Sequence, residues 1–348
     1  MDSKQNLKLR LIVMNFLIFA VWGAYLCSLG IYLGRVGMGA KIGSFFAVQG
    51  IISLFMPALM GIVADRWVPA QKLLGICHFL SAIFMAIAGF MGMKYGDSIT
   101  FGQIFPWYTL GVAFFMPTIA LGNSVSYNAL TKAGMDTVKD FPPIRVFGTI
   151  GFILSMWIVN FTGFKNNYNQ LFVSAGWGII LAFYAFTLPD CPVNRERKSA
   201  SLVDAFGLRA FALFKDSKMC VFFIFSFLLG MCLQVTNGFA TPYLDDFGRL
   251  PEYADAFAVK NNVFLSSISQ AMMADSTTRS PQTAFITVTK SGTPWMTETS
   301  MHLTPLGTGN PQSAMTKYSV WPRADNSFRI SGFSKPLFFI TRPSQHLL

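Results

Sequence analysis

Charged side chains are scarce in this sequence of 348 residues, of which they make up only 12%. A soluble domain carries about 25%. Seven intervals of at least 19 residues contain no charge at all: 11–34, 42–64, 73–93, 98–131, 146–164, 166–189 and 219–244. A helix needs about 20 apolar residues to cross roughly 30 Å of hydrocarbon. The scarcity of charge therefore excludes an ordinary soluble domain and predicts a chain that crosses a membrane several times.

The sequence also lacks the groups of side chains on which enzyme chemistry depends. It shows no nucleophile–base pair, no metal-ligand cluster and no phosphate-binding loop. The five cysteines do not have the spacing of a metal site, so they are predicted to be small apolar fillers. His78 stands alone in an apolar interval, where a packing role is favoured over a proton relay. We therefore expect no enzyme, no cofactor and no metal.

The apolar intervals predict an all-α, polytopic membrane protein. They are apolar on all sides and do not alternate with period two, which indicates helices rather than barrel strands. The first, Leu11–Leu33, is interpreted as a retained span, because it is long for a signal peptide and lacks a clear cleavage site. The interval 98–131 is longer than one span needs, so its polar end is expected to pass beyond the bilayer or to line a cavity.

The order of these elements is typical of a transporter built from two six-helix halves. Six intervals precede Pro189, a basic stretch follows at 190–218, and apolar sequence resumes at Met219. The amino terminus and the loops on its side hold 14 lysines and arginines, and the opposite loops hold 4. Basic loops face the cytoplasm, so the amino terminus is predicted to be cytoplasmic. These loops also explain much of the net charge of +11 without a nucleic-acid partner.

One arginine stands at the mouth of an apolar interval, in "DFPPIRVFGTIGF" (Asp140–Phe152). Arg145, Thr149 and Phe152 are spaced i, i+4 and i+7, which places them on one face of a helix. A charge at this depth usually faces the bundle interior or a watery cavity. The alternative is an arginine that extends to the cytoplasmic surface.

Three amides also lie in apolar sequence. Gln234 and Asn237 are three residues apart in one interval, and Gln270 closes "FLSSISQ" in a predicted eighth span. Amides in hydrocarbon need partners, which favours a polar cavity, with hydrogen bonds between helices as the alternative. Amides, a hydroxyl, an arginine and an aromatic ring suit a neutral, polar, flat ligand. A sugar or a polar amino-acid-like solute fits these residues as well.

The loop "GIVADRWVPAQK", Gly61–Lys72, resembles the short Gly-x-x-x-Asp-Arg loop of the major facilitator superfamily. The resemblance implies that Gly61 allows a close helix approach. It also implies that Asp65, Arg66 and Lys72 belong to a charge cluster that helps to hold one state of the transport cycle. The segment "WVPAQK" departs from the Gly-Arg-Arg that is more frequent in that superfamily, and an ordinary charged loop is the alternative.

Longer motifs resemble the bacterial nucleoside:proton symporters of this superfamily: "AGMDTVKDFPPIRVFGTIGFILSMW", "LQVTN" and "SSISQ", within about residues 7–270. The resemblance implies a permease of the bacterial inner membrane that carries nucleosides such as uridine and adenosine together with protons. The family's proton-coupling acid has no counterpart here, since the charge-free intervals hold no carboxylate. The residues implied to line the nucleoside pocket are Arg145, Thr149, Phe152, Gln234, Asn237 and Gln270.

The resemblance ends after Gln270. The 78 residues that follow contain ten serines and twelve threonines and no apolar run of spanning length. They are predicted to be a poorly ordered polar tail, whose origin is a shifted reading frame, a chimeric join or an early-terminated gene, with a genuine regulatory tail as the alternative. The predicted division is a six-span bundle at 1–189, a cytoplasmic linker at 190–218, the first one or two helices of a second bundle at 219–270, and the tail at 271–348. The alternative to an active permease is a truncated fragment that does not function alone.

Overall fold

The computed structural model describes residues 3–191 and 214–278, in which every regular element is a helix. The predicted linker and tail lie largely outside these ranges. The helices are α1 (Ser3–Gly23), α2 (Leu29–Arg35), α3 (Ile42–Arg66), α4 (Ala70–Tyr95), α5 (Phe101–Lys132), α6 (Thr137–Phe161), α7 (Asn169–Ala185), α9 (Ser217–Phe247), α10 (Phe257–Lys260) and α11 (Asn262–Thr278). Three single 3-10 turns also occur: η1 (Gly39–Lys41), η2 (Gly96–Ser98) and η3 (Phe164–Asn166).

Each of the seven charge-free intervals forms helix, which confirms the predicted all-α fold. Among the described residues, six stretches are long and apolar enough to cross a membrane, and they correspond to α1, α3, α4, α5, α6 and α9. The seventh interval forms α7, which is shorter at 17 residues. At 32 residues, α5 is the longest of the helices, about 48 Å at 1.5 Å per residue. It therefore exceeds the bilayer core, as its interval predicts.

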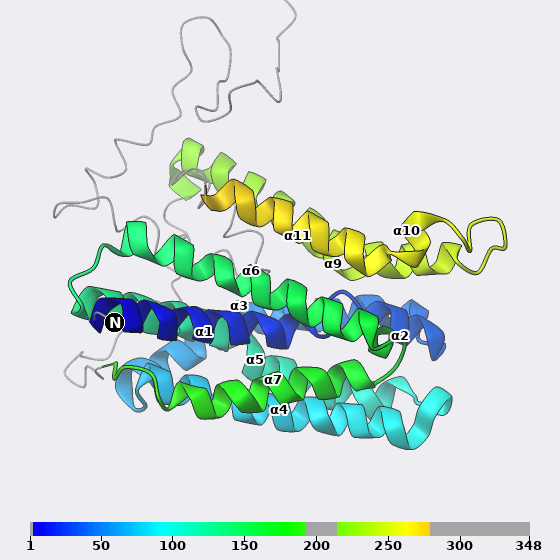
Figure 1. Cartoon of the computed structure of the whole chain (residues 1–348), viewed down its shortest axis with the longest axis horizontal. Coiled ribbons are helices and arrows are strands. Elements are labelled where there is room, and N and C mark those ends of the chain that lie inside the picture. The colour runs from blue at the N-terminus through cyan, green and yellow to red at the C-terminus, as the bar shows by residue number, and fades with distance from the viewer. Residues whose placement is uncertain (1–2, 192–213, 279–348) are drawn as a thin grey trace, which may run out of the picture.

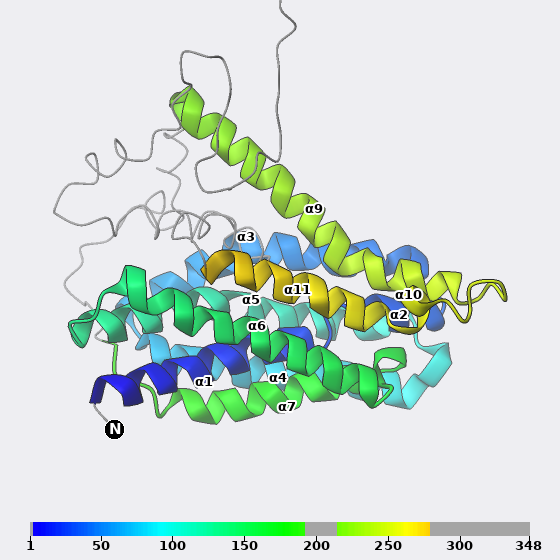
Figure 2. The ribbon, with the colours of Figure 1, turned by 45° about the horizontal axis from the view of Figure 1, so that its top comes forward.

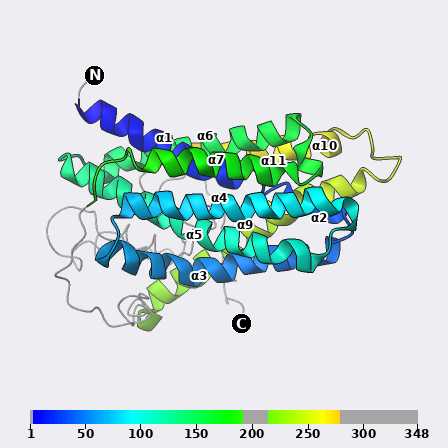
Figure 3. The ribbon, with the colours of Figure 1, turned by 90° about the horizontal axis from the view of Figure 1, so that it is seen from below.

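The helices α1 and α3 to α7 form one bundle along the long axis of the molecule (Figure 1). Within it α4 packs against α5 and α7, α1 packs against α6 and α7, and α3 packs against α5. The view from below shows α7, α4 and α3 in successive rows (Figure 3). The largest fully buried side chains include Tyr25, Phe45, Tyr108 and Phe115. Many exposed residues on α3, α4 and α7 are large and apolar, as expected for surfaces that face lipid.

The first span is broken, which corrects the predicted single helix Leu11–Leu33. It consists of α1 and α2 joined by a turn at residues 24–28. Backbone hydrogen bonds of helical spacing continue through much of this turn, such as that from the N–H of Leu29 to the carbonyl oxygen of Tyr25 at 2.8 Å, and contacts outside the helix are added to them. The Ser28 hydroxyl donates to Oε1 of Gln170 at 2.8 Å, and the carbonyl oxygen of Cys27 accepts from the Thr241 hydroxyl of α9. The break thus depends on packing partners that lie far away in the sequence.

The helix α6 begins earlier than the sequence suggested. The Asp136 carboxylate accepts the backbone N–H of Val138 at 2.9 Å and so caps the helix start. The two prolines of "DFPPIR" therefore lie inside the helix, although a proline removes a backbone donor there. Arg145 stands eight residues after the first helical residue, Thr137, or about 12 Å along the axis. Arg145 therefore lies two turns inside α6, while the charge-free interval still begins directly after it.

The helices α9 and α11 pack against each other and against the first bundle, α9 on α2 and α11 on α6. Figure 2 shows α9 meeting α2 at one end and leaving the bundle at the other. We call the end that holds α2, η3 and α10 the far end, because it is opposite to the amino terminus (Figure 1). The tail was predicted to begin directly after Gln270. The helix α11 instead continues for eight more residues, to Thr278.

Candidate ligand-binding site

Two of the three predicted residues on α6 contact aromatic rings of α1. The guanidinium carbon of Arg145 lies 3.8 Å from the centroid of the Phe19 ring, a distance at which a cation–π interaction is favourable. Phe152 is buried, and its ring meets Trp22 edge to face with centroids 6.2 Å apart. Thr149 lies between them along α6 and is half-buried. Since Phe19 is itself buried, the Arg145 head group lies over an interior ring rather than at the helix end.

The aromatic partners on α1 were not identified from the sequence. Phe19 and Trp22 are three residues apart, and Trp22 also lies 6.1 Å from the ring of Phe115 on α5. Aromatic residues are ordinary constituents of membrane helices, so their presence in "FLIFAVWGAY" carries no signal by itself. Only the pairing of α1 with α6 shows that these rings adjoin Arg145 and Phe152.

The approach of α1 to α6 depends on glycines. A Cβ atom on Gly151 would lie 2.2 Å from the carbonyl oxygen of Phe16, and one on Gly23 would lie 2.3 Å from that of Phe152. Any side chain at these two positions would force the backbones apart. The glycines therefore allow the contact that brings Phe19 and Trp22 to Arg145 and Phe152.

The predicted amides lie on α9 and α11. Nε2 of Gln270 donates to Oδ1 of Asn237 at 3.0 Å. Both side chains are half-buried, as is Gln234 one helical turn before Asn237. This bond joins the two helices, as the interhelical alternative requires. It uses one donor and one acceptor, and an amide has further donors and lone pairs to offer a ligand.

The two groups of residues lie on helices that pack against each other. On α6, Nε1 of Trp157 donates to Oγ of Ser267 on α11 at 2.9 Å. The two helices run in opposite directions (Figure 1). Moving from Ser267 to Gln270 along α11 is therefore moving from Trp157 toward Thr149 and Arg145 along α6. The predicted site residues therefore lie on α6, next to rings of α1, and on α9 and α11, of which α11 packs against α6.

The loop between α3 and α4 is a connection of three residues, Trp67–Pro69. Asp65 and Lys72 are exposed on either side of it, and Arg66 is half-exposed. A Cβ atom on Gly61 would meet no atom within 4 Å. The close helix approach that the resemblance implied for Gly61 is therefore not made in this structure, where α3 packs against α5 on another face.

His78 on α4 is fully buried and lies 5.8 Å from the ring of Phe115, centroid to centroid. Within the described residues neither ring nitrogen has a hydrogen-bond partner. The side chain is packed, as predicted, but its nitrogens are not satisfied by the protein. No group of three or more His, Cys, Asp or Glu side chains in residues 3–191 and 214–278 could hold a metal ion.

This arrangement is that of a multi-pass helical membrane protein in which two further helices pack against a first bundle, as in membrane transporters. A family model described as nucleoside H+ symporter matches residues 5–277, so the chain belongs to that family. The resemblance noted in the sequence is thereby confirmed.

The relatives are permeases. The chain is 42% identical to the xanthosine permease of Escherichia coli (strain K12) over 268 residues, 76% of this chain and 62% of the relative. It is 42% identical to the nucleoside permease NupG of the same organism over 267 residues, again 76% of this chain and 62% of the relative. The chain thus spans less than two thirds of the length of these relatives.

Two crystal structures of the nucleoside transporter NupG are also similar. One, of a mutant, has a TM-score of 0.70 at 40% identity, and the match covers 82% of this chain and 69% of that chain. The other has a TM-score of 0.65 at 41% identity, with coverage of 77% and 65%. The helical arrangement described above is therefore that of a solved nucleoside transporter over most of its described length.

Proposed function

We propose that this chain is a nucleoside permease that carries nucleosides together with protons across the bacterial inner membrane by alternating access. The proposal is supported by its membership of the family and by its relatives, which are permeases of xanthosine and other nucleosides. The structural observation that carries it is the placement of Arg145 over Phe19 on α6 and α1 and of the Asn237–Gln270 pair on α9 and α11, of which α11 packs against α6.

Each side chain of the site has a role that suits a nucleoside. The amides of Gln234, Asn237 and Gln270 can both donate to and accept from ribose hydroxyls and base edges. The ring of Phe152 provides an aromatic surface on which a base can stack. Arg145, held against Phe19, supplies donors at a fixed position. We assign no proton carrier to the described residues.

Nucleoside binding to the purified chain tests the ligand. Uridine and adenosine should bind saturably in isothermal titration calorimetry on nanodisc-embedded protein, and glucose should not bind. Binding of glucose in place of either nucleoside would favour a sugar carrier. Uptake of labelled uridine by cells that lack their own nucleoside permeases addresses transport separately. Binding without uptake would identify the chain as a fragment that holds the site but does not transport.

We further propose that the amino terminus lies in the cytoplasm, from the excess of 14 basic residues over 4 on its side. Single cysteines should then be labelled asymmetrically in a cysteine-free background. Asp97→Cys, in η2 at the far end, should react with an impermeant maleimide added to intact cells. Lys139→Cys, at the start of α6, should react only after the cells are opened. Both native residues are exposed, so the reverse pattern would show the opposite orientation.

A further inference from the structure

The two groups of helices make close contact at the far end. The Thr241 hydroxyl of α9 donates to the carbonyl oxygen of Cys27 in the broken first span, and Thr241 is buried. One residue further on α9, Pro242 lies over Gly30, where an added Cβ atom would be 2.4 Å from Cγ of the proline. A side chain at residue 30 would therefore push α9 away from α2.

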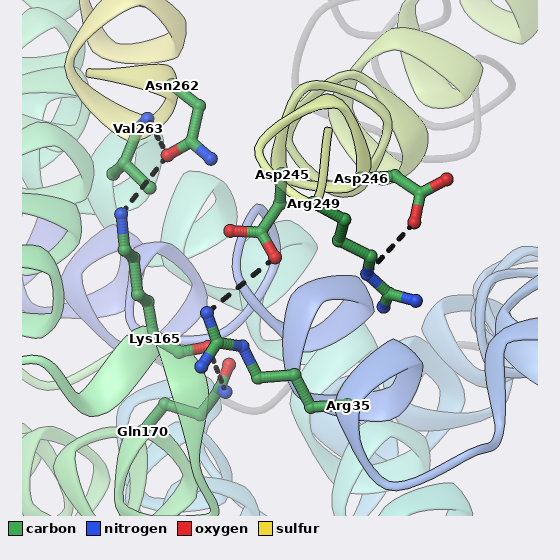
Figure 4. Close-up of polar contacts among 8 residues, drawn as sticks. All are labelled: Arg35, Lys165, Gln170, Asp245, Asp246, Arg249, Asn262 and Val263. Carbon is green, nitrogen blue, oxygen red and sulfur yellow. Dashed lines mark hydrogen bonds and ion pairs between the residues drawn. The ribbon is translucent and has the colours of Figure 1, made fainter. Parts of the chain in front are cut away.

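Cys27, Gly30, Thr241 and Pro242 form a seam between α9 and the broken first span. Two polar contacts lie beside this seam, and both join the first bundle to α9 or α11 (Figure 4). Nη2 of Arg35 on α2 lies 3.8 Å from Oδ2 of Asp245 on α9. Nζ of Lys165 in η3 donates to Oδ1 of Asn262 at 3.3 Å. Asn262, the acceptor in the second contact, is the first residue of α11 and is buried. The four residues thus connect two segments of the first bundle to two helices outside it.

Both ends of the Lys165 contact are held in place by further hydrogen bonds. Nε2 of Gln170 donates to the backbone carbonyl oxygen of Lys165 at 3.4 Å. Oδ1 of Asn262 also accepts the N–H of Val263 at 2.7 Å, which fixes the side chain against the start of α11. Figure 4 shows the Lys165 side chain reaching across to Asn262.

The charge of Lys165 depends on its neighbours. Burial lowers the pKa of its ammonium group, and the nearby Arg35 adds to this, whereas Asp245 acts in the opposite direction. A half-buried cation of this kind is held in place only if acceptors and an opposite charge compensate for its lost hydration. Asn262 and Asp245 provide that compensation only while α9 and α11 remain against the first bundle.

In the opposite half of α9, several of the described side chains are large, apolar and exposed. Val221 is 67% exposed, Phe225 is 64% exposed and Met231 is 50% exposed. Gly238, by contrast, is buried against the ring of Phe46, and the contacts of Thr241, Pro242 and Asp245 follow within two further turns. These contacts of α9 with the first bundle all lie toward the far end.

We propose that Arg35, Lys165, Asp245 and Asn262 form a polar lock that keeps the far end of the molecule closed. Opening of this end then requires Arg35 to leave Asp245 and Lys165 to leave Asn262, while the seam of Cys27, Gly30, Thr241 and Pro242 separates. The lock matters for transport only if the proposed function holds, because alternating access requires each end to open in turn. Its existence can be measured without transport.

Cys27 is a native reporter of this closure. It is 1% exposed, and its Sγ lies 3.8 Å from Oγ of Ser266 on α11. With Cys77, Cys191, Cys220 and Cys232 replaced by alanine, the rate at which maleimide alkylates the full chain in nanodiscs reports how often the seam opens. Contacts between partly exposed charged groups are modest, so we expect Asp245→Asn and Lys165→Gln each to raise this rate about two- to fivefold.

The chain offers a matched control on the same helix. Asp246, near the end of α9, pairs at 3.1 Å with Arg249 in the turn that follows, and this pair does not bridge the two groups of helices (Figure 4). Asp246→Asn should leave the alkylation rate unchanged. Equal rates for Asp245→Asn and Asp246→Asn would overturn the lock. If Asp245→Asn does not yield folded protein, comparing the alkylation rate of Arg35→Gln with that of Asp246→Asn answers the same question.

An exchange of charges adds a second test. Arg35→Asp and Asp245→Arg should each raise the rate of Cys27 alkylation, and the double variant should return this rate to that of the native pair. A double variant that is alkylated as fast as the single ones would contradict the pairing. Nucleoside binding measured on the same samples separates the two proposals. Faster alkylation in a chain that binds no nucleoside supports the lock and contradicts the proposed function. Unchanged alkylation in a chain that does bind nucleoside contradicts the lock alone.

Discussion

A single added methyl group at Gly151 is expected to destabilise the chain severely. The new Cβ atom would lie 2.2 Å from the carbonyl oxygen of Phe16. The backbones of two packed helices fix the positions of both atoms, so no change of rotamer relieves the overlap. The helices α1 and α6 must separate, which also opens the contact between Gly23 and Phe152. Overpacking a tight interior costs about 1–3 kcal/mol, and a clash between backbones places Gly151→Ala at the upper end of that range.

The melting temperature and monodispersity of the purified protein in detergent measure this effect. Gly176→Ala on α7 is the matched control, because residue 176 is exposed and its Cβ atom would meet nothing within 4 Å. Alanine has a higher helix propensity than glycine, so the control should melt at the same temperature or higher. Similar melting temperatures for the two variants would show that α1 and α6 can move apart without loss, contrary to the tight contact seen in the structure.

The helical fold could be predicted because one physical demand governs it. Backbone groups in hydrocarbon must be bonded within their own segment, so each apolar interval had to be a helix, and α3 to α7 and α9 confirm this. The break at residues 24–28 could not be predicted in the same way. The sequence there is as apolar as its surroundings, and two residues that bond to this turn, Gln170 and Thr241, lie far away in the chain.

The site shows the same division between local and distant causes. The spacing of Arg145, Thr149 and Phe152 correctly placed them on one helix, since that depends only on helical periodicity. The start of α6 before the two prolines was not predicted, because it depends on the cap at Asp136 and a proline is unusual inside a helix. Phe19 and Trp22 were missed because the periodicity of one helix does not show which other helix packs against it. The roles of all six predicted pocket residues and the domain boundaries stay predictions.

Replacing Arg145 is expected to give the largest loss of ligand binding. Its guanidinium group lies over the Phe19 ring at 3.8 Å, which fixes its donors inside the bundle rather than at the surface. Arg145→Ala removes those donors and leaves a bound ligand's acceptors unpaired. The cost of an unpaired polar group is about 1–3 kcal/mol, or about 5- to 150-fold in the dissociation constant for uridine or adenosine. Titration calorimetry on nanodisc-embedded protein measures this change directly.

Two further variants separate the geometry of the guanidinium group from its charge. Arg145→Lys keeps the charge but loses the planar group that stacks on Phe19, so its binding should be intermediate between that of the native chain and that of Arg145→Ala. Lys139→Ala removes a cation from the same helix, at a side chain that is 84% exposed and pairs with Asp136 at 3.8 Å, so nucleoside binding should not change. If Arg145→Ala and Lys139→Ala both bind nucleoside as the native chain does, Arg145 contributes to the packing of α6 on α1 and not to the ligand site. Native affinity in Arg145→Lys together with weak binding in Arg145→Ala would instead show that the positive charge suffices and that the stacked geometry over Phe19 is not required.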